Sequence, residues 1–227
     1  MYYLICGSWR RDQSQGEQVI SIQRSRRSQL TKEESTQEIT LVLLENEEAA
    51  WMINAKEVLQ AQLARGLGLD RYAEIMRGDP ASPDFQRAFN GYYRIRRNEK
   101  WRQHYYDLFA KAKIGRFSFE QIIKELYRLT GNVEASFSSK MLATIDASKP
   151  IWDQYVLQNL GLELTGKSQE EKLQNAVALY AQIVNWYADY LTTDEARENI
   201  IEFDRLLPEY TWVSDTKKID CLLWSKR

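Results

Sequence analysis

Residues 129–145 read LTGNVEASFSSKMLATI, and residues 146–162 continue with DASKPIWDQYVLQNLGL. The first half places a Gly-Asn turn before a run of small residues, and small side chains let a neighbouring helix or a ligand approach the backbone closely. The second half is a polar turn that leads through Pro150 to Asp153, residue types that favour the start of another helix. The stretch therefore predicts a turn, a small-residue helix, a polar turn and a second helix.

The sequence on either side of this stretch also has helical spacing. Apolar residues recur three and four positions apart from Glu47 onward, and the chain contains only 10 Gly and 4 Pro. Ser82-Pro83 has the form of an N-cap followed by proline, and both Ser118 and Ser168 begin patterns of the capping-box type. We therefore expect about eight or nine helices and a mainly α fold.

The first 45 residues differ from the rest of the chain. Residues 18–23 and 38–44 alternate apolar and polar side chains as short strands do, and the basic stretch 24–28 separates them. Two interpretations remain open for this segment, a small β-hairpin and a poorly ordered arm. We accordingly expect an N-terminal segment over residues 1–45 and a helical domain over residues 46–227.

Composition narrows the classes of function. The 227 residues carry a net charge of −1 and include 2 Cys and 1 His, which excludes a disulfide framework and a zinc site of the usual kind. We expect no metal and no cofactor. Residues 1–7 lack a basic leader and are too few to span a bilayer, so a cytoplasmic protein without membrane contact is expected.

Charge is unevenly distributed along the chain. Residues 87–128 hold 11 basic and 4 acidic residues, whereas the segments before and after them are net acidic. Arg94, Arg96 and Arg97 lie here among tyrosines and tryptophan, a combination typical of nucleic-acid-binding grooves. The other interpretation is a solvated helix face whose aromatic residues belong to the core.

The order of features in residues 129–162 resembles the helix-hairpin-helix superfamily of DNA base-excision glycosylases. In that family a Leu-Pro-Gly-Val-Gly hairpin opens a small-residue helix, and a segment with the catalytic Asp and an Arg-Leu-Gly-Leu ending follow. Residues 129–133 stand at the hairpin, residues 150–156 at the Asp segment, and residues 159–162 match the ending. The resemblance implies a multi-helix glycosylase-like fold, DNA as partner and Asp153 as the catalytic carboxylate.

Three departures from the family pattern refine this interpretation. The hairpin has one of its two glycines, and Gln154 and Tyr155 replace the Thr-His pair that follows the Asp. The position of the Schiff-base lysine of bifunctional members falls near Phe137, with Lys140 about one helical turn later. An active protein would then be monofunctional, with Asp153 orienting water or stabilising the cationic sugar. The alternative is a non-catalytic helical binding module that keeps the fold, with Asp153 only a helix N-cap.

The same segment supplies further candidate contacts to the DNA backbone. Gly131 and Asn132 are expected to contact phosphate through the turn, and Ser136, Ser139 and Lys140 through the helix after it. The structural alternatives are a C-cap for Gly131, where glycine is common, and a small-residue packing face for the serines with Lys140 in solvent.

Overall fold

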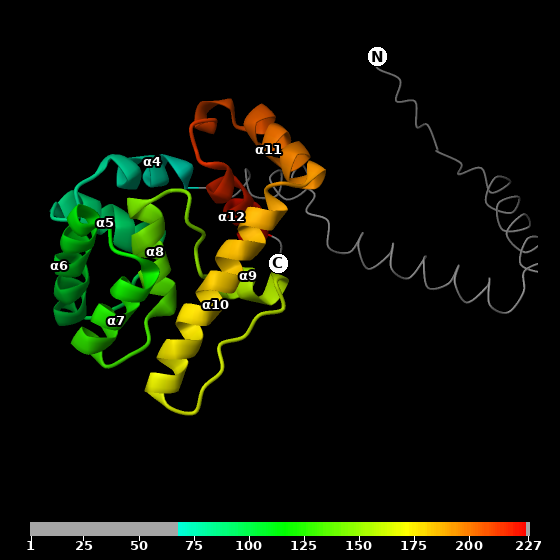
Figure 1. Cartoon of the computed structure of the whole chain (residues 1–227). Helices are drawn as coiled ribbons and strands as arrows, with labels where there is room; N and C mark the ends of the chain where they lie inside the picture. Colours follow the sequence, from blue (N-terminus) through cyan, green and yellow to red (C-terminus); the bar gives the residue numbers. More distant parts are fainter. Residues whose placement is uncertain (1–67, 226–227) are drawn as a thin grey trace, which may run out of the picture. The chain divides into compact units, whose positions relative to one another are not determined.

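The computed structural model describes residues 68–225. Of these residues 72% are helical, and no strand occurs among them (Figure 1). The prediction of a mainly α fold is therefore confirmed for this part of the chain. The expected hairpin or arm, and the predicted boundary after residue 45, lie outside the described residues, all of which belong to the compact unit Ile53–Arg227.

The described chain is a succession of α-helices with one short 3-10 turn. In order they are α4 (Leu69–Arg77), α5 (Pro83–Tyr92), α6 (Glu99–Gly115), α7 (Phe119–Thr130), α8 (Ala135–Ile145), α9 (Gln154–Asn159), α10 (Gln169–Tyr190), α11 (Asp194–Leu206), η1 (Pro208–Tyr210) and α12 (Asp215–Ser225). No helix between residues 68 and 225 combines the length and the apolar character that crossing a bilayer requires.

Polar caps fix where the helices begin, as the sequence predicts. The Ser118 hydroxyl accepts a hydrogen bond from the backbone N–H of Gln121, whose side chain accepts one from the backbone N–H of Ser118. Ser82 caps α5 with proline at the first helical position, and Ser168 caps α10. Such caps satisfy N–H groups that have no partner inside the helix, each worth about 1 kcal/mol.

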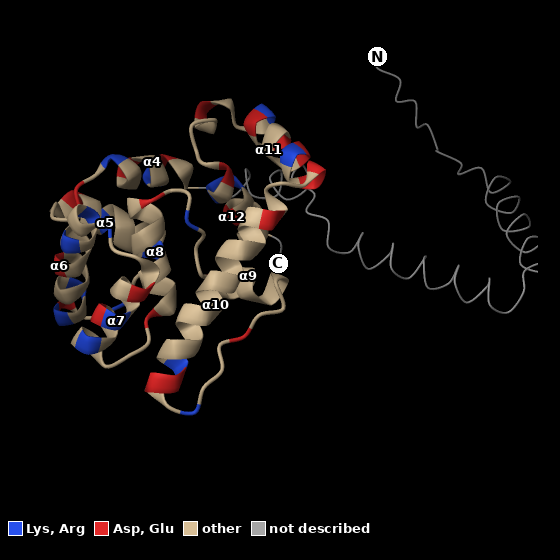
Figure 2. Cartoon of the chain, in the orientation of Figure 1, with Lys and Arg blue, Asp and Glu red and all other residues tan. Residues whose placement is uncertain are grey.

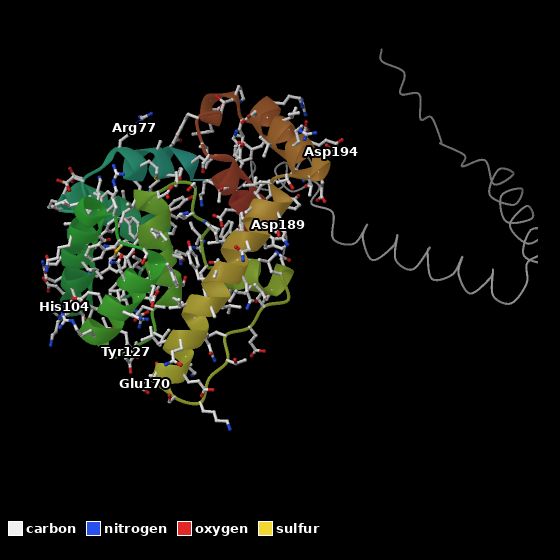
Figure 3. All side chains as sticks on the ribbon, in the orientation of Figure 1. Arg77, His104, Tyr127, Glu170, Asp189 and Asp194 are labelled. Carbon is white, nitrogen blue, oxygen red and sulfur yellow. The ribbon has the colours of Figure 1, made fainter. Side chains whose placement is uncertain are left out.

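The main helix contacts of the described residues fall into three groups. Helices α6, α7 and α8 pack against one another, and α4 packs on α5 (Figure 1). Helix α10 packs on α7, where the Tyr127 hydroxyl donates a 2.8 Å hydrogen bond to the Glu170 carboxylate (Figure 3). Helix α12 packs on α9 and α11, so the C-terminal helices lie directly beside the segment that carries Asp153.

Aromatic side chains make up much of the core. The Phe89 ring lies 5.5 Å from Phe85 and 5.4 Å from Phe109, centroid to centroid, and all three are buried. The apolar tail 221–223 is buried against this core. Trp212 stacks on Tyr72 yet remains 46% exposed.

The three arginines Arg94, Arg96 and Arg97 do not lie on a helix face. Helix α5 ends at Tyr92, and Asn98 caps α6 by accepting a hydrogen bond from the backbone N–H of Trp101, so residues 93–98 form a linker. Arg94 in this linker has a left-handed backbone, with φ of 53°. The alternative of a solvated helix face is therefore wrong for Arg94, Arg96 and Arg97.

Candidate functional site

The turn between α7 and α8 is built as a helix C-cap. Gly131 has φ of 72°, and its backbone N–H donates to the carbonyl of Tyr127. The backbone N–H of Asn132 donates to the Thr130 hydroxyl, and the Asn132 amide donates to the Thr130 carbonyl. The capping interpretation of Gly131 is confirmed. Because both N–H groups of the turn already have partners within the protein, phosphate contact by Gly131 and Asn132 stays a prediction.

A buried glutamate anchors the end of this turn to α6. Glu134 is 5% exposed, and its carboxylate accepts a hydrogen bond of 3.1 Å from the Trp101 indole and one of 2.9 Å from Arg97. The Arg97 guanidinium also lies 5.5 Å from the ring centre of Trp101 and 5.4 Å from that of Phe137. Arg97, predicted as a DNA contact, is thus engaged by protein groups. Glu134 is not predictable as a site residue from the sequence, because nothing in its local pattern signals burial.

Arg94 and Arg96 are exposed in the linker, within a segment whose cations are mostly unpaired. Residues 94–116 contain eight Lys and Arg residues, and among the described residues only Arg97 of these forms an ion pair. In residues 117–225, by contrast, seven of ten Lys and Arg residues are ion paired. Figure 2 shows basic residues along α6 and the linker before it, and Figure 3 places His104 on the outer side of α6. This segment therefore concentrates positive charge, most of which has no carboxylate partner within residues 68–225.

On α8, the two predicted serines have different partners. Ser139 is fully buried, and its hydroxyl accepts a 2.8 Å hydrogen bond from the backbone N–H of Trp152 and donates to the carbonyl of Ser136. The Ser136 hydroxyl accepts a 2.9 Å hydrogen bond from the Lys140 ammonium. Ser139 thus ties α8 to the segment before α9. Because Lys140 follows Ser139 and Asp153 follows Trp152, this bond brings the neighbourhoods of the two charged residues together.

The segment that carries Asp153 is anchored by stacked rings and hydrogen bonds. The Trp152 ring is stacked parallel to Phe119, which in turn stacks on Tyr180 at a centroid distance of 3.8 Å. The Tyr180 hydroxyl donates a 2.9 Å hydrogen bond to the carbonyl of Pro150, two residues before Trp152. Asp153 itself is half-buried and accepts a 3.0 Å hydrogen bond from the backbone N–H of Tyr155. The N-cap interpretation is confirmed, and it leaves the catalytic one open because one carboxylate oxygen suffices for the cap.

The charge of Lys140 interacts with this carboxylate. Burial lowers the pKa of the Lys140 ammonium, and the charges of Asp153 and Asp220 act in the opposite direction. The ammonium lies 5.7 Å from the ring centre of Tyr93 and 5.3 Å from that of Phe137. The expectation of Lys140 in solvent is therefore wrong. Lys140 and Asp153, both described, interact electrostatically but form no ion pair within 4.0 Å.

A second pair of charges, which no local sequence pattern indicates, lies buried on α12. The Lys217 ammonium is 2.7 Å from the Asp220 carboxylate, and both side chains are under one-tenth exposed. The Lys217 ammonium also lies 5.3 Å from the ring centre of Tyr72 and 5.8 Å from that of Tyr92. An i, i+3 pair of opposite charges usually marks an exposed helix face, so its sequence pattern indicates the opposite of its location.

Two positive and two negative charges therefore interact in one cluster, which consists of Lys140, Asp153, Lys217 and Asp220. Lys217 and Asp220 neutralise each other directly, whereas Lys140 and Asp153 remain apart. Nowhere in residues 68–225 do three His, Cys, Asp or Glu side chains gather as ligands of a metal ion would. Compared with known proteins, the chain matches no family model, no curated protein and no solved structure.

Proposed function

We propose that this protein binds DNA and acts as a monofunctional base-excision glycosylase, with Asp153 as its catalytic carboxylate. The proposal rests on the resemblance of residues 129–162 to the helix-hairpin-helix glycosylases and on one observation, the Asp153 carboxylate at the end of a segment anchored by Ser139 and Tyr180. Breaking a glycosidic bond creates positive charge on the sugar, and a preorganised carboxylate stabilises that charge without reorganising. Water then adds to the sugar carbon, and the carboxylate takes up the proton that the water loses.

The unpaired cations of residues 94–116 support DNA as the partner. Lys and Arg residues without a carboxylate partner are available to phosphate. Their binding releases counterions from the DNA, so the affinity depends on salt.

The observations at the α7–α8 turn favour a second candidate function. Because Arg97 and the turn's N–H groups are engaged by the protein, the chain could instead be a helical binding module without excision activity.

One substitution separates capping from catalysis at Asp153. Asparagine caps a helix about as well as aspartate, so Asp153→Asn should retain most of the free energy of unfolding. Excision on a panel of damaged duplexes should fall by at least about 100-fold, since the charge that stabilises the sugar cation is gone. An Asn variant as active as the wild type would remove Asp153 from the mechanism. A wild-type protein that binds DNA and excises nothing would favour the binding module.

The DNA partner is tested through the salt dependence of binding. If Arg94 and Arg96 each neutralise a phosphate, replacing both with Ala should reduce the slope of log K against log salt by about two. Arg77→Ala combined with Lys167→Ala is the matched control, because both residues are exposed, unpaired among the described residues and outside the basic segment. An unchanged slope in the Arg94 and Arg96 variant would leave these arginines as ordinary surface charge.

A further inference from the structure

We infer that this protein associates head to tail with further copies of itself, through two exposed surfaces of opposite charge at the two ends of helix α4. The basic surface is the end of α6 and consists of Lys113, Ile114 and Arg116. The acidic surface is the turn around η1 and includes Glu209 and Trp212. Each surface supplies the charge and the apolar contact that the other one lacks a partner for.

The basic surface lies where α6 ends. Residues 108–116 contain three Lys and Arg residues and no Asp or Glu, and residues 113–116 are all exposed. Ile114 is 87% exposed, between Lys113 and Arg116. Single exposed apolar side chains are common on proteins, but this one lies within positive charge that no neighbouring acidic residue of the segment balances. The surface therefore suits a partner that combines apolar and acidic groups.

The acidic surface lies between α11 and α12. The Trp212 ring stacks on Tyr72, with 6.0 Å between the ring centroids and 11° between their planes, and Trp212 remains 46% exposed. Residues 206–216 contain two acidic residues and no basic residue. Asp70 lies beside them, because its carboxylate accepts a 2.6 Å hydrogen bond from the Tyr210 hydroxyl. An exposed indole among carboxylates favours Lys and Arg side chains, since its ring face attracts cations.

The cations beneath the acidic surface are paired inside the protein. Lys217 is bound to Asp220 at 2.7 Å, and the Lys218 ammonium lies 2.8 Å from Asp204, with both lysines buried. Glu209, by contrast, is exposed and forms no ion pair with another described residue. Its negative charge is therefore available to a partner.

Helix α4 keeps the two surfaces apart within one molecule. Near its start, Tyr72 stacks on Trp212, and directly after its end the Gly78 carbonyl accepts a 3.1 Å hydrogen bond from the Lys113 ammonium. The nine residues of α4 span about 13 Å at 1.5 Å per residue. Figure 1 shows α4 between α6 and the side of α11 and α12. One molecule therefore cannot close its own two surfaces on each other, and a second copy can.

Two different surfaces on each molecule make the contact heterologous. Each copy binds one neighbour through its basic surface and another through its acidic surface, so association continues into a chain of molecules or closes into a ring. A cation of one copy then lies on the Trp212 ring of the next, and Ile114 adds apolar area. Because exposed charges are screened by salt, the contact should weaken as the ionic strength rises.

This inference goes beyond the proposed function and does not depend on it. Arg94 and Arg96, the DNA contacts chosen for the salt test, lie before the opposite end of α6. This helix has 17 residues and is about 25 Å long. Self-association and the tested DNA contacts therefore use different ends of α6, and either can fail without the other.

Sedimentation velocity of the full chain, freed of nucleic acid by nuclease, tests the association. At low salt the wild type should exceed the mass of two chains as its concentration rises, and it should return to single chains near 1 M salt, where the Debye length is about 3 Å. The basic-surface variant Lys113→Glu/Arg116→Glu and the acidic-surface variant Glu209→Lys/Trp212→Ala should each remain single chains. Trp212→Ala alone should weaken the association about 30-fold, as the loss of a hot-spot residue does.

A mixture of the two double variants gives the most specific result. Each variant keeps one intact surface, so a 1:1 mixture should form dimers that grow no further. A mixture that stays as single chains while the wild type associates would overturn the inference. Glu209→Lys alone tests the acidic surface if circular dichroism shows that Trp212→Ala alters the fold.

Charge-matched controls separate these surfaces from net charge. Arg96→Glu/Lys100→Glu, at the other end of α6, and Glu198→Lys on α11 change exposed residues by the same number of charges and should associate like the wild type. Equal loss of association in these controls would overturn the inference, and so would a wild type that stays a single chain at every concentration. Association that disappears on nuclease treatment would assign the basic surface to nucleic acid and would overturn it as well.

Discussion

The buried pair Lys217–Asp220 on α12 allows the sharpest prediction about stability. Asp220→Asn keeps the shape of the side chain and removes its charge, which leaves the Lys217 ammonium buried without a counter-ion. Both side chains are under one-tenth exposed, and the ammonium lies 2.7 Å from the carboxylate. Removing one partner of such a pair costs about 3–5 kcal/mol, because the remaining charge has lost both water and its counter-ion.

The expected change in melting temperature follows from the size of the chain. For domains of 150–250 residues, 1 kcal/mol shifts the melting temperature by about 2–4 °C, so Asp220→Asn should lower it by roughly 6–20 °C. Urea unfolding followed by circular dichroism at 222 nm gives the same quantity as a free energy. The double variant Lys217→Met/Asp220→Leu should recover most of the loss, since apolar residues of similar volume replace a buried pair at little cost.

A matched control uses an exposed pair of the same type. Lys124 and Glu120 are paired on α7 with both side chains more than half exposed, so Glu120→Gln should change the free energy of unfolding by at most about 1 kcal/mol. The pH dependence supplies a second check. Burial opposes the charged form of Lys217, but Asp220 raises its pKa well above the ordinary value. The stabilisation should therefore be complete at neutral pH and be lost only as the pH rises beyond the ordinary lysine range.

The reasoning would be refuted by an Asp220→Asn variant whose stability lies within about 1 kcal/mol of the wild type, the value of an exposed pair. It would equally be refuted by a double variant no more stable than the single one. In that case the cost would come from altered packing of α12 and not from an uncompensated charge.

Three further predictions concern the segment around α8. Ser139→Ala should cost about 1–3 kcal/mol in urea unfolding because the buried N–H of Trp152 loses its acceptor, whereas Ser138→Ala should be nearly neutral because that buried hydroxyl has no partner among the described residues. Equal losses in the two variants would contradict this. Burial lowers the pKa of Lys140 in the folded chain. At pH values between the folded and the unfolded pKa, the unfolded chain therefore binds more protons than the folded chain. The free energy of unfolding should rise with pH in this range. Lys140→Met should be more stable at neutral pH and lack this rise in denaturation measured against pH; a retained rise would contradict the assignment. Glu134→Gln should destabilise the fold and shift tryptophan fluorescence, since its carboxylate accepts hydrogen bonds from a buried indole and a guanidinium; an unchanged emission spectrum would exclude that role.

Local sequence rules predict helix ends better than they predict where charges lie. Ser82, Ser118 and Asp153 all begin helices as expected, because an N-cap depends on residues two or three positions away. Arg94 and its neighbours form a linker instead of a helix face, because Asn98 caps α6 and the chain turns at Arg94. The residue types of this linker keep a pattern typical of a helix, although its backbone is not helical.

The candidate site depends on contacts between residues far apart in the chain, and no local pattern contains these. Asp153 could be singled out because it lies within a recognisable stretch. Lys217 and Asp220 lie more than 60 positions later, and only the packing of α12 on α9 brings their charges into the range of Lys140. Glu134 likewise requires the contact between the α7–α8 turn and Trp101.

The two pairs of opposite charge, Lys217 with Asp220 and Lys140 with Asp153, differ because only the first is an ion pair. A protein that needed four charges only for stability would gain most by closing both pairs, since an open pair loses solvation without gaining direct attraction. Lys217 and Asp220 are paired at 2.7 Å, whereas Lys140 and Asp153, both described, form no ion pair within 4.0 Å. The fold thus fixes two charges of opposite sign at a distance where neither satisfies the other. Preorganised groups of this kind are costly to a resting protein and useful to one that must stabilise separated charges in a ligand.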